Sequence, residues 1–82
     1  MATIITSPLA LEGILSRRER QVMHWASQGM TNARIASELD VSTHAVKFHL
    51  ASIYRKLGVA NRTEATARYI GALAGSDQMT VG

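Results

Sequence analysis

Apolar residues recur every three or four positions along most of the chain, which is the spacing of helices that bury one face. Four such segments follow one another with short joints, and they begin near Ser16, Thr31, Ser42 and Asn61. No alternating apolar–polar run is long enough to predict a strand. The pattern therefore predicts an all-α fold, a four-helix bundle.

Capping residues mark the beginnings of the first and last predicted helices. Ser16 and Glu19 have the spacing of a capping box, in which the hydroxyl accepts a backbone N–H and the carboxylate returns to the N–H of the cap. Asn61 and Glu64 repeat this spacing at the last helix. We expect that helix to end at Gly75.

The length of 82 residues limits the chain to one domain. Residues 1–14 are interpreted as a tail or linker with a short helical turn over residues 9–14. Residues 15–75 form the predicted domain, and residues 76–82 form a C-terminal tail that frays because it has glycine and serine and no helical stripe.

The third predicted helix, over residues 42–57, has two unlike faces. At about 100° per residue, four aliphatic side chains fall within about 40° of one line. These side chains are Val46, Leu50, Ile53 and Leu57. Phe48 lies on the opposite side among basic and small residues. Because an exposed phenylalanine lowers solubility, it indicates a surface that meets a partner.

The second and third segments together predict a helix-turn-helix, since a short helix and a longer two-faced helix are joined by a tight turn. In that unit the second helix lies in the major groove of DNA. Lys47 can donate to guanine, Phe48 can contact a thymine methyl, and Ala51 lets the backbone approach. Ser42 and Thr43 present hydroxyls and N–H groups at a positive helix end that suits a phosphate.

Composition narrows the class of protein further. Nine basic residues against six acidic ones give a net charge of +3, which favours a polyanionic partner only weakly. No cysteine is present, so disulfides and thiolate metal sites are excluded. No apolar run approaches a membrane span, and the start of the chain lacks the basic segment of a signal peptide. We expect a cytoplasmic protein without membrane contact.

The three histidines do not predict a metal site. His44 and His49 are five residues apart, which places them on different faces of one helix, and His24 lies in another helix. No glycine-rich phosphate loop or nucleophile elbow appears in the sequence. We expect no metal, no cofactor and no enzymatic activity.

Six short motifs occur in order between Leu15 and Ala65: L-S-x-R-E, Q-G-M-T-N, I-A-x-x-L, V-S-x-x-x-V-K-x-H, I-Y-x-K-L-G-V and N-R-T-E-A. In this combination the segment resembles the LuxR-type (GerE-type) DNA-binding domain of transcriptional regulators. The resemblance implies a four-helix fold and sequence-specific binding of double-stranded DNA. It also implies a dimer through the fourth helix on an inverted repeat, and RNA polymerase is a further candidate partner.

The resemblance also assigns roles to single positions. Residues expected to face the bases are Lys47, Phe48, Ala51 and Ser52. Residues expected near the DNA backbone are Thr31, Asn32, Ser42, Thr43, His44, His49, Arg55, Lys56 and Arg62. Residues expected at the dimer interface are Ala65, Tyr69, Ala72 and Leu73.

The chain departs from the family's pattern at four positions. Arg34 replaces a glutamate and adds a candidate backbone contact, whereas Ala45 replaces a threonine and removes one phosphate hydrogen bond. Asp40 stands where a glycine is common and tolerates left-handed geometry less easily. Arg17 stands where proline is common. These changes affect individual contacts and leave the motif intact.

Two alternatives stay open. The exposed Phe48 face could belong to a protein-interaction module, which a shallow salt dependence would reveal. The helix pair also resembles the fourth region of sigma factors, although the segment LGVANRTEA and the fourth helix favour the LuxR type. Members of this family often carry an upstream domain that receives a phosphate, as in response regulators, or binds a ligand.

Overall fold

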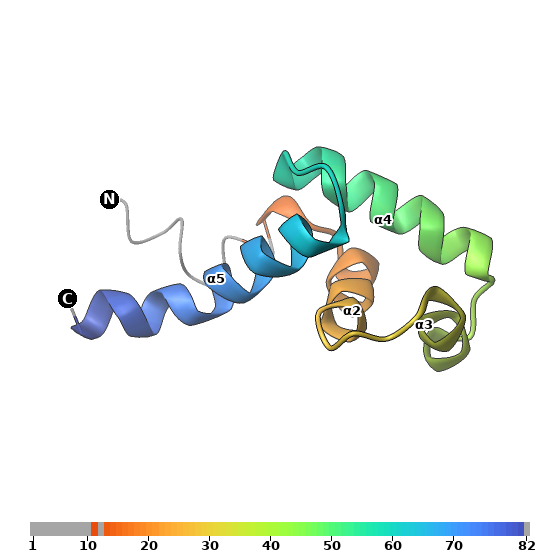
Figure 1. Ribbon diagram of the computed structural model, residues 1–82, viewed down its shortest axis with the longest axis horizontal. Helices are drawn as coiled ribbons and strands as arrows, with labels where there is room; N and C mark the ends of the chain where they lie inside the picture. The colour runs from red at the N-terminus through yellow and green to blue at the C-terminus, as the bar shows by residue number, and fades with distance from the viewer. Residues whose placement is uncertain (1–10, 12, 82) are drawn as a thin grey trace.

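The computed structural model describes residue 11 and residues 13–81, and the side chains up to Leu73. Four helices follow one another in this part of the chain: α2 (Arg17–Ala26), α3 (Asn32–Leu39), α4 (Thr43–Leu57) and α5 (Arg62–Val81) (Figure 1). No strand occurs among the described residues. The predicted all-α fold with a helix-turn-helix is confirmed.

The expected capping residues start the helices. Glu19 N donates to Ser16 Oγ over 3.1 Å, and Ser16 N donates to Glu19 Oε1 over 2.8 Å, so the predicted capping box is present. At α5, Glu64 N donates to Asn61 Oδ1 over 2.9 Å. The Glu64 carboxylate accepts from Ala60 N over 2.8 Å, one residue before the position expected from the capping-box pattern.

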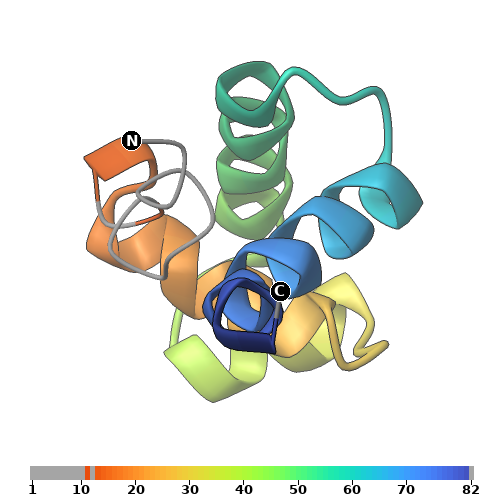
Figure 2. The ribbon, with the colours of Figure 1, turned by 90° about the vertical axis from the view of Figure 1, so that its left-hand side faces the viewer.

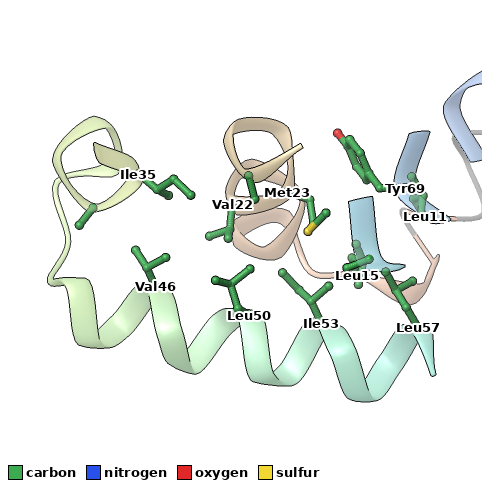
Figure 3. Close-up of a cluster of buried hydrophobic side chains, with 13 residues drawn as sticks. Leu11, Leu15, Val22, Met23, Ile35, Val46, Leu50, Ile53, Leu57 and Tyr69 are labelled. Carbon is green, nitrogen blue, oxygen red and sulfur yellow. The ribbon is translucent and has the colours of Figure 1, made fainter. Parts of the chain in front are cut away.

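The core lies between α4 and the other helices. The aliphatic line of α4 points toward α3, α2 and the start of α5 (Figure 3). Val46 and Ile53 are completely buried, and Leu50 and Leu57 nearly so, which confirms the inward face predicted from the 3.6-residue period. Val22 and Met23 of α2 and Ile35 of α3 fill the opposite side: this single cluster fixes which side of α4 stays open.

Residues 13 and 14 and residue 11 are helical, and Leu15 N donates to Leu11 O over 2.7 Å. This agrees with the described part of the helical turn expected over residues 9–14. Residues 9, 10 and 12 of that turn lie outside the described residues.

Asp40 ends α3 in the left-handed conformation, with φ 56° and ψ 49°. Val41 N then donates to Ala36 O over 3.0 Å, and Ser42 caps α4 directly afterwards. The joint between the two helices is therefore as tight as the helix-turn-helix prediction requires. Because Asp40 carries a Cβ where glycine is common, the turn has a small backbone strain.

The end of α5 differs from the sequence-based expectation. The helix continues to Val81 and does not end at Gly75. A glycine costs a helix about 1 kcal/mol relative to alanine, but it does not forbid helical dihedral angles. The predicted C-terminal tail is therefore helical up to residue 81, and α5 projects from the rest of the bundle (Figure 1). Figure 2 shows the same helix with its C-terminal end toward the viewer. The domain limits at residues 15 and 75 stay a prediction.

Candidate nucleic-acid interface

The outer face of α4 is open. Helix α4 runs along one edge of the bundle, and α2 and α3 lie on its inner side (Figure 1). Phe48 is 68% exposed, and Lys47 and Ala51 are exposed beside it. The prediction that this face points away from the core is confirmed. Its chemistry is a cation, an aromatic ring and a methyl group on one helix surface.

Phe48 has only one aromatic neighbour among the described residues. Its ring centroid lies 6.1 Å from that of His49, at an interplanar angle of 70°. This edge contact leaves most of the phenyl ring in water, since the residue remains 68% exposed. Local packing therefore does not account for an aromatic side chain at this position.

The N-terminus of α4 is suited to an anion. Ser42 Oγ accepts from Ala45 N over 3.0 Å, which leaves its O–H free to donate outward. Thr43 and His44 are exposed in the first turn, which contains no acidic residue. Exposed N–H groups and the positive end of the helix dipole together favour a phosphate here. At the other end of the same helix, Arg55 is exposed in the last turn.

The start of α3 is arranged in a similar way. Thr31 Oγ1 accepts from Arg34 N over 3.1 Å and is exposed. The Arg34 guanidinium, where the family has a glutamate, pairs with Glu38 one turn later over 3.2 Å. This exposed pair contributes little to stability. It holds Arg34 along α3, so any phosphate would compete with Glu38 for the guanidinium.

Two residues expected at the DNA are instead bonded to a buried carboxylate of α2. Ser52 Oγ donates to Glu19 Oε2 over 2.7 Å, and Lys56 Nζ donates to Glu19 Oε1 over 2.8 Å. The flank of α4 that carries Ser52 and Lys56 thus faces α2. Ser52 is half-buried, so its hydroxyl is not on the open face with Phe48.

Glu19 is the one charged side chain that is buried among the described residues, at 4% exposure. Burial by itself raises the pKa of the Glu19 carboxyl. Hydrogen bonds from Lys56, Ser52 and the Ser16 backbone, with the charge of Lys56, outweigh burial and lower the pKa to about 2. The carboxylate therefore remains charged at every pH at which DNA binding is measured.

Two further residues that were expected near the DNA backbone contact each other. Arg62 Nη2 donates to Asn32 Oδ1, and Arg62 Nη1 donates to Met30 O over 2.9 Å. Both Arg62 and Asn32 are half-buried. The structure thus brings them together as a link between the start of α5 and the start of α3.

The expected dimer residues divide into two groups. Ala65 is completely buried and Tyr69 is 8% exposed, so both belong to the core of the chain itself and are not available to a partner. Burial also raises the pKa of the Tyr69 phenol. Ala72 is half-buried and Leu73 is 44% exposed. Ile70, at 49% exposure, lies on the open side of α5 and was not among the expected dimer residues.

Sequence reasoning assigned Glu19 only to the capping box and missed its contacts with α4. A signal was present, because Ser52 and Lys56 are four residues apart and therefore share one flank of α4. That flank lies between the open face and the buried line. A hydroxyl and an ammonium in that position indicate a buried acceptor on the neighbouring helix.

Among residues 11 and 13–81, no three histidine, aspartate or glutamate side chains lie close enough to hold a metal ion. None of the helices in the same residues is both long and apolar enough to cross a bilayer.

A family model described as bacterial regulatory proteins, luxR family, matches residues 13–69. This match spans α2, α3, α4 and the first turns of α5. The chain belongs to the luxR family of bacterial regulatory proteins. The resemblance on which the expected fold rested is therefore confirmed. No solved structure gives a significant match.

Individual relatives agree with the family. The transcriptional activator protein YukR of Yersinia ruckeri is 46% identical over 54 residues, which cover 66% of this chain and 24% of the relative. The nitrate/nitrite response regulator protein NarP of Escherichia coli is 40% identical over 57 residues, covering 70% of this chain and 26% of the relative. The HTH-type transcriptional regulator MalT of Yersinia pestis is 45% identical over 62 residues, which cover 76% of this chain and 6% of the relative. The chain thus spans about a quarter or less of these luxR-family relatives.

Proposed function

We propose that this luxR-family chain is the sequence-specific, double-stranded-DNA-binding domain of a transcriptional regulator, with α4 in the major groove. The observation that carries the proposal is the open face of α4, where Phe48 is 68% exposed beside Lys47. Its buried opposite face leaves the helix rigidly mounted and free to enter a groove. Its role is binding and not catalysis.

Base recognition is proposed for three residues of the open face. The Lys47 ammonium donates to guanine O6 and N7, and the Phe48 ring contacts a thymine methyl. Ala51, one turn after Lys47, is small enough to let α4 approach the bases. Ser52 is left out of this set because its hydroxyl is committed to Glu19.

Phosphate contacts are proposed along both helices of the helix-turn-helix. They position the domain and carry no sequence information. The side chains proposed for this role are the exposed Thr31, Ser42, Thr43, His44 and Arg55, together with His49, which is half-buried beside Phe48. Asn32 and Arg62 instead shape the surface through their contact with each other.

Dimerisation through α5 on an inverted repeat is proposed for the exposed side of that helix. Ile70 and Leu73 expose large apolar side chains, and Ala72 lies beside Leu73. Two such helices packed together would remove these side chains from water. An isologous pair of domains requires two half-sites related by a two-fold axis.

We propose a wider role by analogy with the relatives. Relatives named as a transcriptional activator and as a response regulator are about four times longer than the matched segment. We place the domain in a cytoplasmic regulator that meets RNA polymerase at promoters, and in which a further domain receives the signal.

The test is a selection of bound duplexes from a random pool, followed by salt titration of the selected duplex. The proposal expects one enriched half-site, repeated with two-fold symmetry, and a log–log salt slope of several units. A protein-interaction module would give a shallow slope. Duplexes of every sequence left unbound at low ionic strength would contradict the proposal.

A further inference from the structure

A buried acid joins α2 to the recognition helix. The Glu19 carboxylate accepts three hydrogen bonds: from the Ser16 backbone at 2.8 Å, from Ser52 Oγ at 2.7 Å and from Lys56 Nζ at 2.8 Å. Its side chain is only 5% exposed, whereas that of Lys56 is 40% exposed. Every buried polar side-chain atom among the described residues has a partner, so this network is complete.

The network lies where it can fix the rotation of α4 about its own axis. Ser52 and Lys56 follow Phe48 at intervals of four residues, and each step turns by about 40° from the open face toward the side of α4 that packs on α2. The apolar line of Val46 and Ile53 holds α4 against the core, but hydrophobic contact has no preferred direction. Hydrogen bonds to a charged acceptor are directional and strong. A rotation of α4 would lengthen or misalign the hydrogen bonds from Ser52 and Lys56 to Glu19.

The ion pair with Glu19 also limits the contacts that the Lys56 ammonium can make. Moving its ammonium to a DNA phosphate would leave a buried carboxylate without its cation, which is costly. Arg55, the neighbouring cation, is exposed on the outer side of α4 and has no such constraint.

We propose that Glu19 is a positioning residue for DNA recognition: it fixes the rotation of α4 so that Lys47 and Phe48 meet the bases, and it keeps Lys56 away from the phosphates. This inference rests on the proposed DNA-binding function and removes Lys56 from the expected backbone contacts. It assigns to α2 a role in sequence selectivity without any contact with DNA.

The first experiment compares Glu19→Gln with Glu64→Gln. Both substitutions remove one negative charge from a capping glutamate in the first turn of a helix, but only Glu19 contacts α4 side chains. Specific and random duplexes are titrated with each variant over a range of salt concentrations, at a temperature where the circular dichroism shows a folded chain. For Glu19→Gln we expect the specificity ratio to fall about tenfold. Release of Lys56 should also steepen the salt slope by about one.

Glu64→Gln should leave both the specificity ratio and the salt slope as in the wild type. A Glu19→Gln chain that melts at a lower temperature but keeps the wild-type ratio and slope would overturn the inference, because Glu19 would then be merely structural. Should Glu19→Gln not fold, Ser52→Ala retains the capping box and the ion pair and removes one hydrogen bond. It should lower the specificity ratio about threefold, and an unchanged ratio would again overturn the inference.

The second experiment compares Lys56→Met with Arg55→Met by salt titration. Each removes one positive charge and retains a long apolar stem. We expect Arg55→Met to lower the slope by about one and Lys56→Met to leave it unchanged. A slope lowered equally by both would place Lys56 on a phosphate and overturn the inference. A wild-type chain that binds no duplex would instead contradict the proposed function, so the two failures are distinguishable.

Discussion

The Arg62 guanidinium donates to the Asn32 side-chain oxygen, and this contact joins the first turn of α5 to the first turn of α3. A second hydrogen bond, from Arg62 to Met30 O over 2.9 Å, holds the loop before α3. One side chain thus ties the start of α5 to the start of the helix-turn-helix unit. Met30 and Asn32 flank Thr31, a proposed phosphate contact. The hydrogen bonds of Arg62 therefore affect both the stability of the domain and the shape of the DNA-facing surface.

Arg62→Ala should therefore destabilise the chain in the absence of DNA. Removing two charge-assisted hydrogen bonds from a half-buried site should lower the free energy of unfolding by about 1–3 kcal/mol, measured by urea denaturation. Arg55→Ala, on the exposed face of α4, is the control and should change it by less than about 0.5 kcal/mol. If Arg62→Ala leaves stability unchanged and lowers the salt slope of DNA binding, Arg62 is a phosphate contact instead.

Asp40→Gly should stabilise the domain. Asp40 has a φ of 56°, where glycine avoids the clash of a Cβ, so we expect the free energy of unfolding to rise by up to about 1 kcal/mol. Asp40→Ala should lower it, because alanine keeps the Cβ and loses the local hydrogen bonding that aspartate offers. Thermal melts of the three chains test this order. Alanine matching or exceeding glycine would show that left-handed strain is not the deciding term.

The sequence was sufficient to predict the four helices, apart from the end of α5, and the two faces of α4. Val46 and Ile53 recur at helical spacing, and any neighbour that covers them must leave Phe48 on the other side. The left-handed conformation of Asp40 was indicated by the family resemblance, because a glycine is common at this position. These features depend on residues that are close together in the chain.

The roles of single polar residues were harder to predict because their partners are distant in the sequence. A lysine such as Lys56 suits a phosphate and a buried carboxylate equally well, and its partner Glu19 is 37 residues away. Ala65 posed a similar problem, since a small residue on an apolar stripe fits a core and a dimer seam alike. Whether Ala65 lies in the core or at the seam depends on the angle at which α5 crosses α2 and α4. Helical periodicity alone does not predict that angle.

Acid should remove the contribution of Glu19 to stability. Its pKa is lowered from the usual 4.5 to about 2, so the stabilisation is fully present above about pH 4.5 and is lost as the pH falls toward 2. The linked free energy is at most about 3 kcal/mol. Urea denaturation between pH 7 and pH 3 should therefore show a steeper loss for the wild type than for Glu19→Gln. Parallel curves for the two chains would mean that the carboxyl titrates normally.

Leu73→Asp should weaken binding to a duplex with two half-sites much more than binding to one half-site. The exposed apolar side of α5 is the proposed seam, and a buried, unpaired carboxylate there would oppose association. Gln21→Asp is the control for the added charge, because Gln21 is exposed on α2 and lies outside the proposed seam. It should leave the preference for two half-sites intact. Equal losses on both duplexes with Leu73→Asp would remove α5 from the interface.

Lys47→Ala should cost about 1–3 kcal/mol at the selected site and relax the base preference at one position, because a major-groove donor to guanine would be lost. The exposed location of Lys47 predicts no change in the melting temperature of the free chain. Titration against the selected duplex and its single-base variants measures both the loss and the position affected. A uniform weakening across all duplexes, with a salt slope lower by about one, would instead place the Lys47 ammonium on a phosphate.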